Sequence, residues 1–236
     1  MLIAQKTNRT EYSMKKIFLL GAATALCAFV SCAQAVTTPK YTEFYYQRES
    51  LFNVLPVDST NIVMLGNSLT NGAEWHELFN NPKVVNRGIT GDTAQGIQDR
   101  LTPVTSGHPA KIFLLTGAND ISHHLTADSI ATAIVELVET IRQQTPDTKI
   151  YVQSILPINN SFGRYKNMID KEQVVVDVNN LMQPRLEALG VTWLDVNPLF
   201  ADENGNLRTD YTNDGLHLLG PAYLVWRDFL LPYINE

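Results

Sequence analysis

The chain has 236 residues, of which 44% are hydrophobic, enough to bury one substantial core, and no internal repeat or low-complexity tract divides it. It carries 18 basic and 24 acidic residues, a net charge of −6 at pH 7, without a basic cluster. This balance argues against nucleic acid or anionic lipid as a partner.

The N-terminal residues 14–35 have the pattern of a secretory signal: two lysines, the 14-residue apolar run Ile17–Val30, and then small residues. The run is shorter than the about 20 residues that a membrane-spanning helix needs, and no later run approaches that length. We therefore expect an exported bacterial protein without a transmembrane span, whose residues 1–35 form a signal peptide region. The residues before Met14 lack this pattern, so Met14 is a candidate start of translation.

Two processing sites compete within this segment. The letters AQA at Ala33–Ala35 fit an A-x-A cleavage site, which would release a soluble protein beginning at Val36. The letters FVSC at Phe29–Cys32 resemble a loose lipobox, in which Cys32 would become the lipidated first residue of an anchored lipoprotein. Periplasmic, secreted and lipid-anchored forms all remain open.

Both cysteines, Cys27 and Cys32, lie in the signal segment. The folded domain therefore has no disulfide, no thiol nucleophile and no cysteine metal ligand, so its chemistry must use oxygen and nitrogen side chains. Removal of residues 1–31 leaves 14 basic and 23 acidic residues, which makes the mature chain more acidic still, at net −9.

The chain after the signal reads as a short lead-in segment and one domain. Aromatic residues and leucines at helical spacing over 41–53 predict a lead-in helix within residues 36–60, and the main domain follows at 61–236. From residue 61, short apolar runs alternate with helical periodicity. The expected strands are residues 61–66, 83–88, 111–117, 149–157 and 191–196. The expected helices are residues 70–80, 93–104, 127–144, 171–189 and 221–234.

This alternation predicts the fold class α/β, with a five-stranded parallel sheet between two layers of helices. The strand runs are nearly continuously apolar, which suits strands covered on both faces. In such sheets the functional site lies at the carboxyl ends of the strands. The polar ends of the first three strands, 66–68, 86–88 and 117–120, should therefore converge in one crevice.

Ser68 follows the first strand and has two interpretations. Serine is favoured at a helix N-cap, whereas a nucleophilic serine needs a base and an orienting acid. The lysine of a Walker loop and the Gly-x-Ser-x-Gly elbow are both absent. Among five histidines, His217 is the candidate base, because one loop turn in Asp214-Gly-Leu-His217 can bring the Asp214 carboxylate to Nδ1 and turn Nε2 toward Ser68.

An oxyanion formed by acyl attack needs preorganised donors. The candidates are the backbone N–H groups of Ser68 and Gly88 and the side-chain amide of Asn119. Each of the last two has a structural alternative, because Gly88 could serve a turn and Asn119 could cap a helix.

Other residues near these positions are candidates with structural alternatives. Trp75 and Asn86 are candidates for substrate contact, although Trp75 could pack in the core and Asn86 could brace the Gly88 loop together with Asp92. His123 and His124 could reach the rim of the crevice, but a third well-spaced ligand is missing, so no metal site is predicted. No organic cofactor is expected either.

The motifs together resemble the SGNH, or GDSL, hydrolases. Four blocks occur in the order of that family: GNSL at 66–69, Gly88 within NRGITGDT, GAND at 117–120 and DGLH at 214–217. The stretches NRGITGDT, PAKIFLLTGAND and LHLLGPAY are most similar to its platelet-activating-factor acetylhydrolase-like and bacterial sialate O-acetylesterase-like branch.

The resemblance implies roles for the residues in these blocks. Ser68 would be the nucleophile, His217 the general base and then acid, and Asp214 its orienting carboxylate, with an oxyanion hole of Ser68, Gly88 and Asn119. The family usually has aspartate before the serine, where this chain has Asn67. We expect retained catalysis with altered local hydrogen bonding.

We therefore expect a flavodoxin-like three-layer α/β/α serine esterase. Its favoured substrates are short-chain, mainly acetyl, esters of carbohydrates such as O-acetylated sialic acid or other glycans. Two alternatives remain open: a lysophospholipase or thioesterase for longer acyl chains, and a catalytically inactive glycan-binding surface protein. The oligomeric state does not follow from the sequence.

Overall fold

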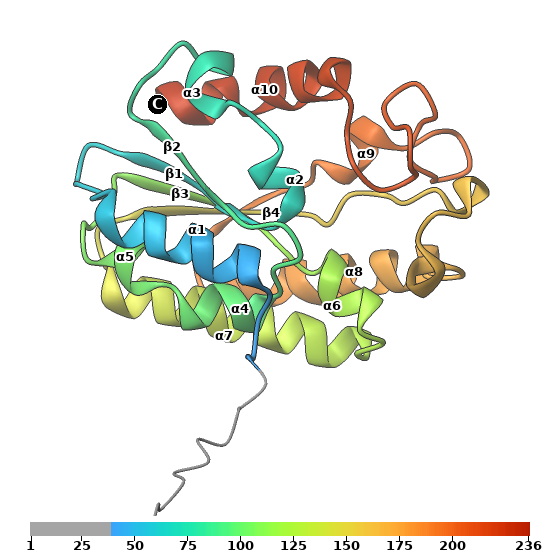
Figure 1. Ribbon diagram of the computed structural model, residues 1–236, viewed down its shortest axis with the longest axis horizontal. Coiled ribbons are helices and arrows are strands. Elements are labelled where there is room, and N and C mark those ends of the chain that lie inside the picture. The colour runs from blue at the N-terminus through green and yellow to red at the C-terminus, as the bar shows by residue number, and fades with distance from the viewer. Residues whose placement is uncertain (1–38) are drawn as a thin grey trace, which may run out of the picture. The chain divides into compact units, whose positions relative to one another are not determined.

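The computed structural model describes residues 39–236 (Figure 1). The predicted signal segment, with its two candidate processing sites and both cysteines, lies outside these residues. Within them, no helix combines the length and the apolar character that crossing a membrane requires.

Five parallel strands form one sheet in the spatial order β2-β1-β3-β4-β5, which is the flavodoxin-like order. The predicted α/β class and five-stranded parallel sheet are therefore confirmed. Gly66 at the end of β1 pairs with Gly88 of β2 and with Leu115 of β3, so these strands end level with one another. The strands are β1 (Ile62–Gly66), β2 (Val84–Gly88), β3 (Lys111–Leu115), β4 (Lys149–Gln153) and β5 (Thr192–Leu194).

Helices connect the strands and cover both faces of the sheet (Figure 1). The α-helices are α1 (Glu43–Val54), α2 (Ser68–Asn71), α3 (Trp75–Leu78), α4 (Ala94–Asp99), α5 (Thr102–Thr105), α6 (Ala118–Ser122), α7 (Ala127–Gln144), α8 (Glu172–Ala188), α9 (Asn197–Phe200) and α10 (Gly220–Asn235). Two short 3-10 helices are η1 (Asn160–Phe162) and η2 (Lys166–Met168).

The sheet separates two hydrophobic cores. Successive side chains of a strand point to opposite faces, so Val63 and Leu65 of β1 pack with α4, α7 and α8, whereas Ile62 and Met64 pack with α3, α9 and α10. Figure 1 shows the same layers, with α7 and α8 on one side of the sheet and α10 on the other. All five residues of β1 are buried, as its continuous apolar composition predicts.

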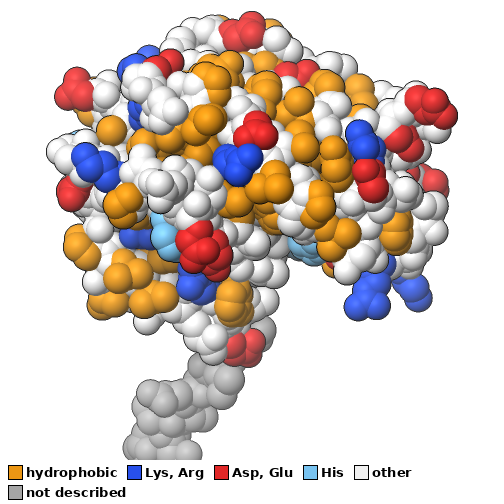
Figure 2. Space-filling view, turned by 90° about the horizontal axis from the view of Figure 1, so that it is seen from above, with side chains coloured by type: hydrophobic (Ala, Val, Ile, Leu, Met, Phe, Trp, Pro, Cys, Tyr) orange, Lys and Arg blue, Asp and Glu red, His pale blue; other side chains and the backbone are white. Residues whose placement is uncertain are grey.

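The outer face of the α10 layer mixes hydrophobic side chains with charges of both signs (Figure 2). Most basic side chains on this face lie near acidic ones, and two basic side chains stand together at the lower right edge of the view.

The predicted helix over 70–80 is two separate short helices, α2 and α3. The side-chain amide of Asn86 on β2 donates to the carbonyls of Thr70 and Ala73, each at 2.9 Å, and this ties the turn between the helices to the sheet. The N–H of Gly72 closes α2 by donating to the Ser68 carbonyl. A contact with a strand that follows later in the chain therefore holds the break between the two helices, after Asn71.

Two other predicted elements are shorter than their sequence patterns. The helix over 93–104 divides into α4 and α5 at Arg100, whose guanidinium turns into the interior to pair with Asp92. The strand over 149–157 ends at Gln153, because the backbone of Ile155 leaves the sheet and bonds in both directions with the side-chain amide of Asn179. The other strands and helices match the predicted ranges to within a few residues.

Candidate functional site

Ser68 lies at the carboxyl end of β1 and is the first residue of α2, but it is not the cap of that helix. Asn67 has that role, because its side-chain oxygen accepts a hydrogen bond from the N–H of Leu69 at 3.0 Å. An amide oxygen makes this bond as a carboxylate would, and Asn67 is buried. The Ser68 hydroxyl is thereby left for other contacts, and its Oγ lies 3.0 Å from Nε2 of His217.

The loop before α10 holds His217 through Asp214. One carboxylate oxygen of Asp214 accepts the backbone N–H groups of Leu216 at 2.9 Å and His217 at 2.8 Å. The other lies 2.8 Å from Nδ1 of His217. The carboxylate accepts, so the hydrogen-bond network assigns the ring proton to Nδ1 and leaves Nε2 as the acceptor that faces the Ser68 hydroxyl.

The pKa of Asp214 lies at about 2. Partial burial works to raise it, but the backbone N–H and imidazole of His217, the N–H of Leu216 and the hydroxyl of Tyr165 outweigh that effect by hydrogen bonding to the charged form. Asp214 is therefore ionised at neutral pH, and its negative charge can stabilise a positive charge on the imidazole.

Tyr165 is a site residue that the sequence patterns do not reveal. Its hydroxyl lies 2.9 Å from Oδ2 of Asp214 and 3.0 Å from Nδ1 of His217. Burial, followed by the hydrogen bond to Asp214, raises the pKa of Tyr165, so the hydroxyl keeps its proton and donates it to the carboxylate. The residue lies in an irregular segment between η1 and η2 that has neither strand nor helix periodicity.

Two predicted oxyanion donors lie at the site. Within residues 39–236, the N–H of Ser68 donates to no acceptor, as is usual in the first turn of a helix. Asn119, near the start of α6, donates one N–H of its side-chain amide to the carbonyl of Asp92 at 2.7 Å. An amide NH₂ has two hydrogens, so a second donor remains for a ligand.

The structure corrects the third predicted donor, Gly88. Its N–H donates to the side-chain oxygen of Asn86 at 2.8 Å, and Gly88 does not line the cavity at Ser68. It is a point of close packing, because a Cβ there would lie 2.3 Å from the backbone nitrogen of Asn71. Gly91, three residues later, lines the cavity instead, and its φ of 82° is one that glycine readily adopts.

Gly91 therefore replaces Gly88 as the candidate donor on this loop. Within the described part of the chain its N–H has no acceptor, and a side chain at this position would meet nothing within 4 Å. The earlier expectation depended on Gly88 ending a strand. The backbone continues beyond that strand and reaches the cavity at Thr90 and Gly91.

The two candidates for substrate contact have other roles. Trp75 is fully buried in the core beneath α10, and its indole N–H donates to the Thr70 carbonyl at 2.8 Å, so it presents no surface to a ligand. The side-chain NH₂ of Asn86 donates to the α2–α3 turn, and its side-chain oxygen accepts the N–H of Gly88. Asn86 does not line the cavity. Both residues support the backbone around Ser68.

A buried ion pair braces the loop that carries Gly91. Arg100 Nε lies 2.7 Å from Asp92, and another guanidinium nitrogen donates to the Gly66 carbonyl at 3.1 Å, directly before the Asn67–Ser68 pair. Burial raises the pKa of Asp92 to about 6, against the opposing effect of the Arg100 charge. The pair fixes the end of β1 relative to the Gly91 loop.

His123 and His124 follow α6 and do not line the cavity. Among the residues that the structure describes, histidine, aspartate and glutamate form no group of three suited to a metal ion.

A cavity of about 530 Å³ opens at the Ser68–His217 pair. It is lined mainly by polar and small side chains, with one arginine and one lysine and without a carboxylate. The lining residues are Ser68, Thr90, Gly91, Ala118, Asn119, Ser122, Arg164, Tyr165, Lys166, Asn167, Met168, Leu216 and His217.

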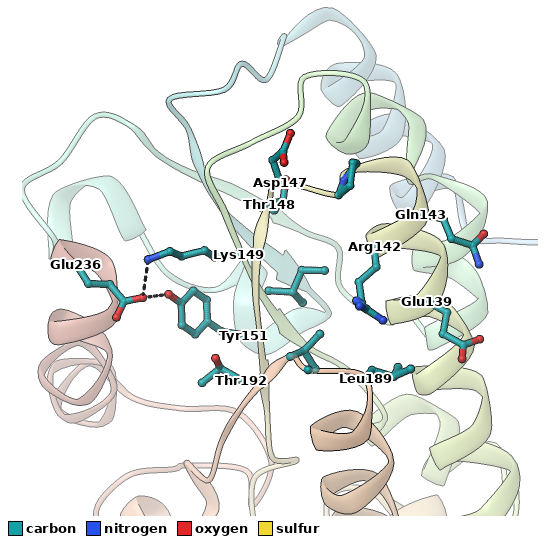
Figure 3. A pocket seen from close by; sticks show the side chains of 14 residues that line it. Glu139, Arg142, Gln143, Asp147, Thr148, Lys149, Tyr151, Leu189, Thr192 and Glu236 are labelled. Carbon is teal, nitrogen blue, oxygen red and sulfur yellow. Dashed lines mark hydrogen bonds and ion pairs between the residues drawn. The ribbon is translucent and has the colours of Figure 1, made fainter.

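A larger cavity of about 880 Å³ lies where β4 and β5 begin, at the opposite end of the sheet (Figure 3). There Glu236 accepts hydrogen bonds from Tyr151 and from Lys149. None of its lining residues, all within the described part, is serine, cysteine or histidine, so it lacks a pair of nucleophile and base. The cavity at Ser68 is therefore the candidate active site.

Comparisons with known proteins show the family of the chain. The family model of the GDSL-like lipase/acylhydrolase family matches residues 64–223, a range that contains Ser68, Gly91, Asn119, Asp214 and His217. Subunit alpha2 of platelet-activating factor acetylhydrolase IB from Rattus norvegicus and from Homo sapiens is 31% identical over 152 residues. That stretch covers 63% of this chain and 63% of each relative, so the chain spans less than two thirds of their length.

Two solved structures are similar over most of the chain. One is a protein from Streptococcus pneumonia that is provisionally described as a platelet activating factor. It is 27% identical to this chain, with a TM-score of 0.74, and the match covers 81% of this chain and 92% of the other chain. A GDSL-like lipase from Bacteroides thetaiotaomicron is 23% identical, with a TM-score of 0.71 over 82% and 98%, a likeness that concerns the fold.

Proposed function

Because this chain belongs to the GDSL-like lipase/acylhydrolase family, we propose that it is a carboxylic ester hydrolase that uses Ser68, His217 and Asp214 as its triad. The observation that carries the proposal is the continuous chain of contacts at the cavity: Asp214 to Nδ1 at 2.8 Å, and Nε2 to the Ser68 hydroxyl at 3.0 Å. Such a chain lets an imidazole accept the serine proton while the carboxylate stabilises the resulting charge.

In the proposed mechanism, Ser68 Oγ attacks the acyl carbonyl while Nε2 of His217 takes its proton. The oxyanion of the tetrahedral intermediate receives hydrogen bonds from the N–H groups of Ser68 and Gly91 and from the side-chain amide of Asn119. Collapse of the intermediate breaks the ester bond, and His217 gives its proton to the departing alcohol. Water then attacks the acyl-serine while His217 takes its proton; the acyl–Oγ bond breaks, His217 returns the proton to Ser68 Oγ, and the carboxylic acid leaves.

We propose short acyl chains, with acetyl favoured, on a carbohydrate such as O-acetylated sialic acid or another glycan. The relatives named acetylhydrolases support the acetyl group. The lining supports a polar alcohol, because Thr90, Ser122 and Asn167 offer hydroxyl and amide groups while Met168 and Leu216 are its larger aliphatic side chains.

Export also belongs to this proposal. The signal pattern of residues 14–35 supports it, and Cys32 is the proposed lipidation site of an anchored form. Intact mass of the protein secreted from a bacterial host separates the two forms, because a chain that begins at Val36 contradicts the lipid anchor.

A ladder of p-nitrophenyl esters, from acetate to dodecanoate, tests the acyl preference. We expect the highest kcat/KM for acetate, followed by release of acetate from acetylated sialic acids, xylan fragments and amino sugars. A preference for chains of eight carbons or more would favour a lysophospholipase or thioesterase. A folded protein that neither hydrolyses these esters nor reacts with a serine-directed fluorophosphonate would favour an inactive glycan-binding protein.

A further inference from the structure

The segment that leads into η2 carries two cations past the proposed active site. It is anchored at two points: the Tyr165 hydroxyl bonds with Asp214 and His217, and the Met168 side chain is buried. Arg164 and Lys166 stand on either side of Tyr165, and both line the cavity at Ser68. The anchors therefore hold the backbone that presents these two charges at the site.

The charges in this cavity contrast with those of the domain. Residues 39–236 contain 14 basic and 23 acidic residues, yet the cavity is lined by Arg164 and Lys166 and by no aspartate or glutamate. Within the described residues, neither cation forms an ion pair. The Arg164 charge acts on the Tyr165 hydroxyl, where it opposes the rise in pKa caused by burial and by Asp214.

The two cations belong to the part of the cavity wall that adjoins His217. His217 must give its proton to the departing alcohol, so the alcohol half of a substrate lies next to Nε2 of His217. The acyl oxygen lies at the donors on Gly91 and Asn119. Gly91 and Asn119 follow β2 and β3, whereas Arg164 and Lys166 follow β4 and flank the residue that contacts His217. The two cations therefore belong to a different part of the cavity wall from the oxyanion donors.

We propose that the enzyme selects esters whose alcohol half carries an anionic group, a carboxylate or a phosphate, and that Arg164 and Lys166 bind this group. The inference rests on the proposed esterase function and narrows its substrate class. A substrate anion supplies the counter-charge that the cavity lacks, and two cations at the mouth attract such a substrate to a protein that is acidic elsewhere.

Three acetyl esters on one sugar skeleton test the inference: acetylated methyl glucoside, acetylated methyl glucuronoside and acetylated methyl glucoside 6-phosphate. For the wild type we expect a higher kcat/KM for the anionic esters than for the neutral one. In the double variant Arg164→Gln/Lys166→Gln, kcat/KM for the anionic esters should fall by about two- to thirtyfold more than kcat/KM for the neutral ester, the range expected for the loss of two exposed ion pairs. The anionic ester with the larger loss identifies carboxylate or phosphate as the preferred group.

A matched control removes one arginine and one lysine from the other cavity, as Arg142→Gln/Lys149→Gln (Figure 3). Its ratio of anionic to neutral kcat/KM should equal that of the wild type, and in the wild type added salt should lower this ratio.

Equal kcat/KM of the wild type for the three sugar esters, with p-nitrophenyl acetate still cleaved, overturns the inference and leaves the esterase proposal standing. An equal loss for charged and neutral esters in the Arg164/Lys166 variant also overturns it, whereas no cleavage of any ester refutes the esterase proposal itself.

Discussion

Replacement of Asn119 by alanine separates the proposed oxyanion hole from the triad. The side-chain amide has two N–H groups; one donates to the Asp92 carbonyl at 2.7 Å, and the other is the proposed donor to the oxyanion. Loss of one preorganised oxyanion donor costs about 2.7–4 kcal/mol in the transition state, so kcat should fall by about 10²–10³. Loss of the bond to Asp92 should lower the free energy of unfolding by about 1 kcal/mol.

Steady-state kinetics with p-nitrophenyl acetate and thermal unfolding measure the two effects separately. KM should change little, because the donor acts on charge that develops in the transition state. Ser122→Ala is the matched control: Ser122 lines the same cavity and its hydroxyl donates to the Asn119 carbonyl at 2.7 Å, but it offers nothing to the oxyanion. A kcat for Asn119→Ala within about fivefold of the control would refute the assigned donor, since one ordinary hydrogen bond accounts for that much.

Three further outcomes follow from the contacts around the triad. Tyr165→Phe removes a donor from the Asp214 carboxylate, so kcat should fall by up to about tenfold with KM little changed; an unaltered kcat would show that the hydroxyl does not help to position the triad. Asn67→Ala removes the cap of α2 and should lower the free energy of unfolding in urea by about 0.5–2 kcal/mol, and an unchanged midpoint speaks against that cap. The pKa of Asp214 is lowered from 3.8 to about 2, so its ionic stabilisation is complete above about pH 4 and is lost as the pH falls toward 2. The difference in Tm between wild type and Asp214→Asn should therefore shrink on acidification through this range, and a widening difference would contradict the assignment.

The sheet was predictable because its strands are buried on both faces. Every residue of β1 and β3 is buried, and apart from Lys111 at the start of β3 these two strands appear in the sequence as apolar runs. The long helix α7 matches its prediction, since its buried stripe recurs at helical spacing and Thr126 caps its start. Patterns of this kind depend on burial alone and need no knowledge of distant contacts.

The backbone around the site was less predictable, because distant groups shape it. The amide of Asn86 holds the break between α2 and α3, and the oxygen of the same side chain accepts the N–H of Gly88. NRGITGDT contains two glycines, and the rule that sites follow strand ends favours the first. Only the path of the loop, with its positive φ at Gly91, shows that the second reaches the cavity.

The residues proposed to bind the alcohol half of the substrate are not marked by any local sequence pattern. Arg164, Tyr165 and Lys166 lie in a segment without strand or helix periodicity, and Tyr165 reaches His217 because the chain folds back after the end of β4. The spacing of Asp214 and His217, in contrast, was informative, since three residues are enough for the carboxylate to bond with the N–H and the ring of the histidine.

The most direct test of the central claim is the site of covalent labelling by a fluorophosphonate, read by mass spectrometry of the digested protein. Ser68 activated by His217 predicts a single adduct, on the peptide that contains Ser68. It also predicts that Ser68→Ala loses both the adduct and about 10⁶ in kcat. A folded wild-type protein that carries no adduct, or that carries it on another serine, would contradict the account.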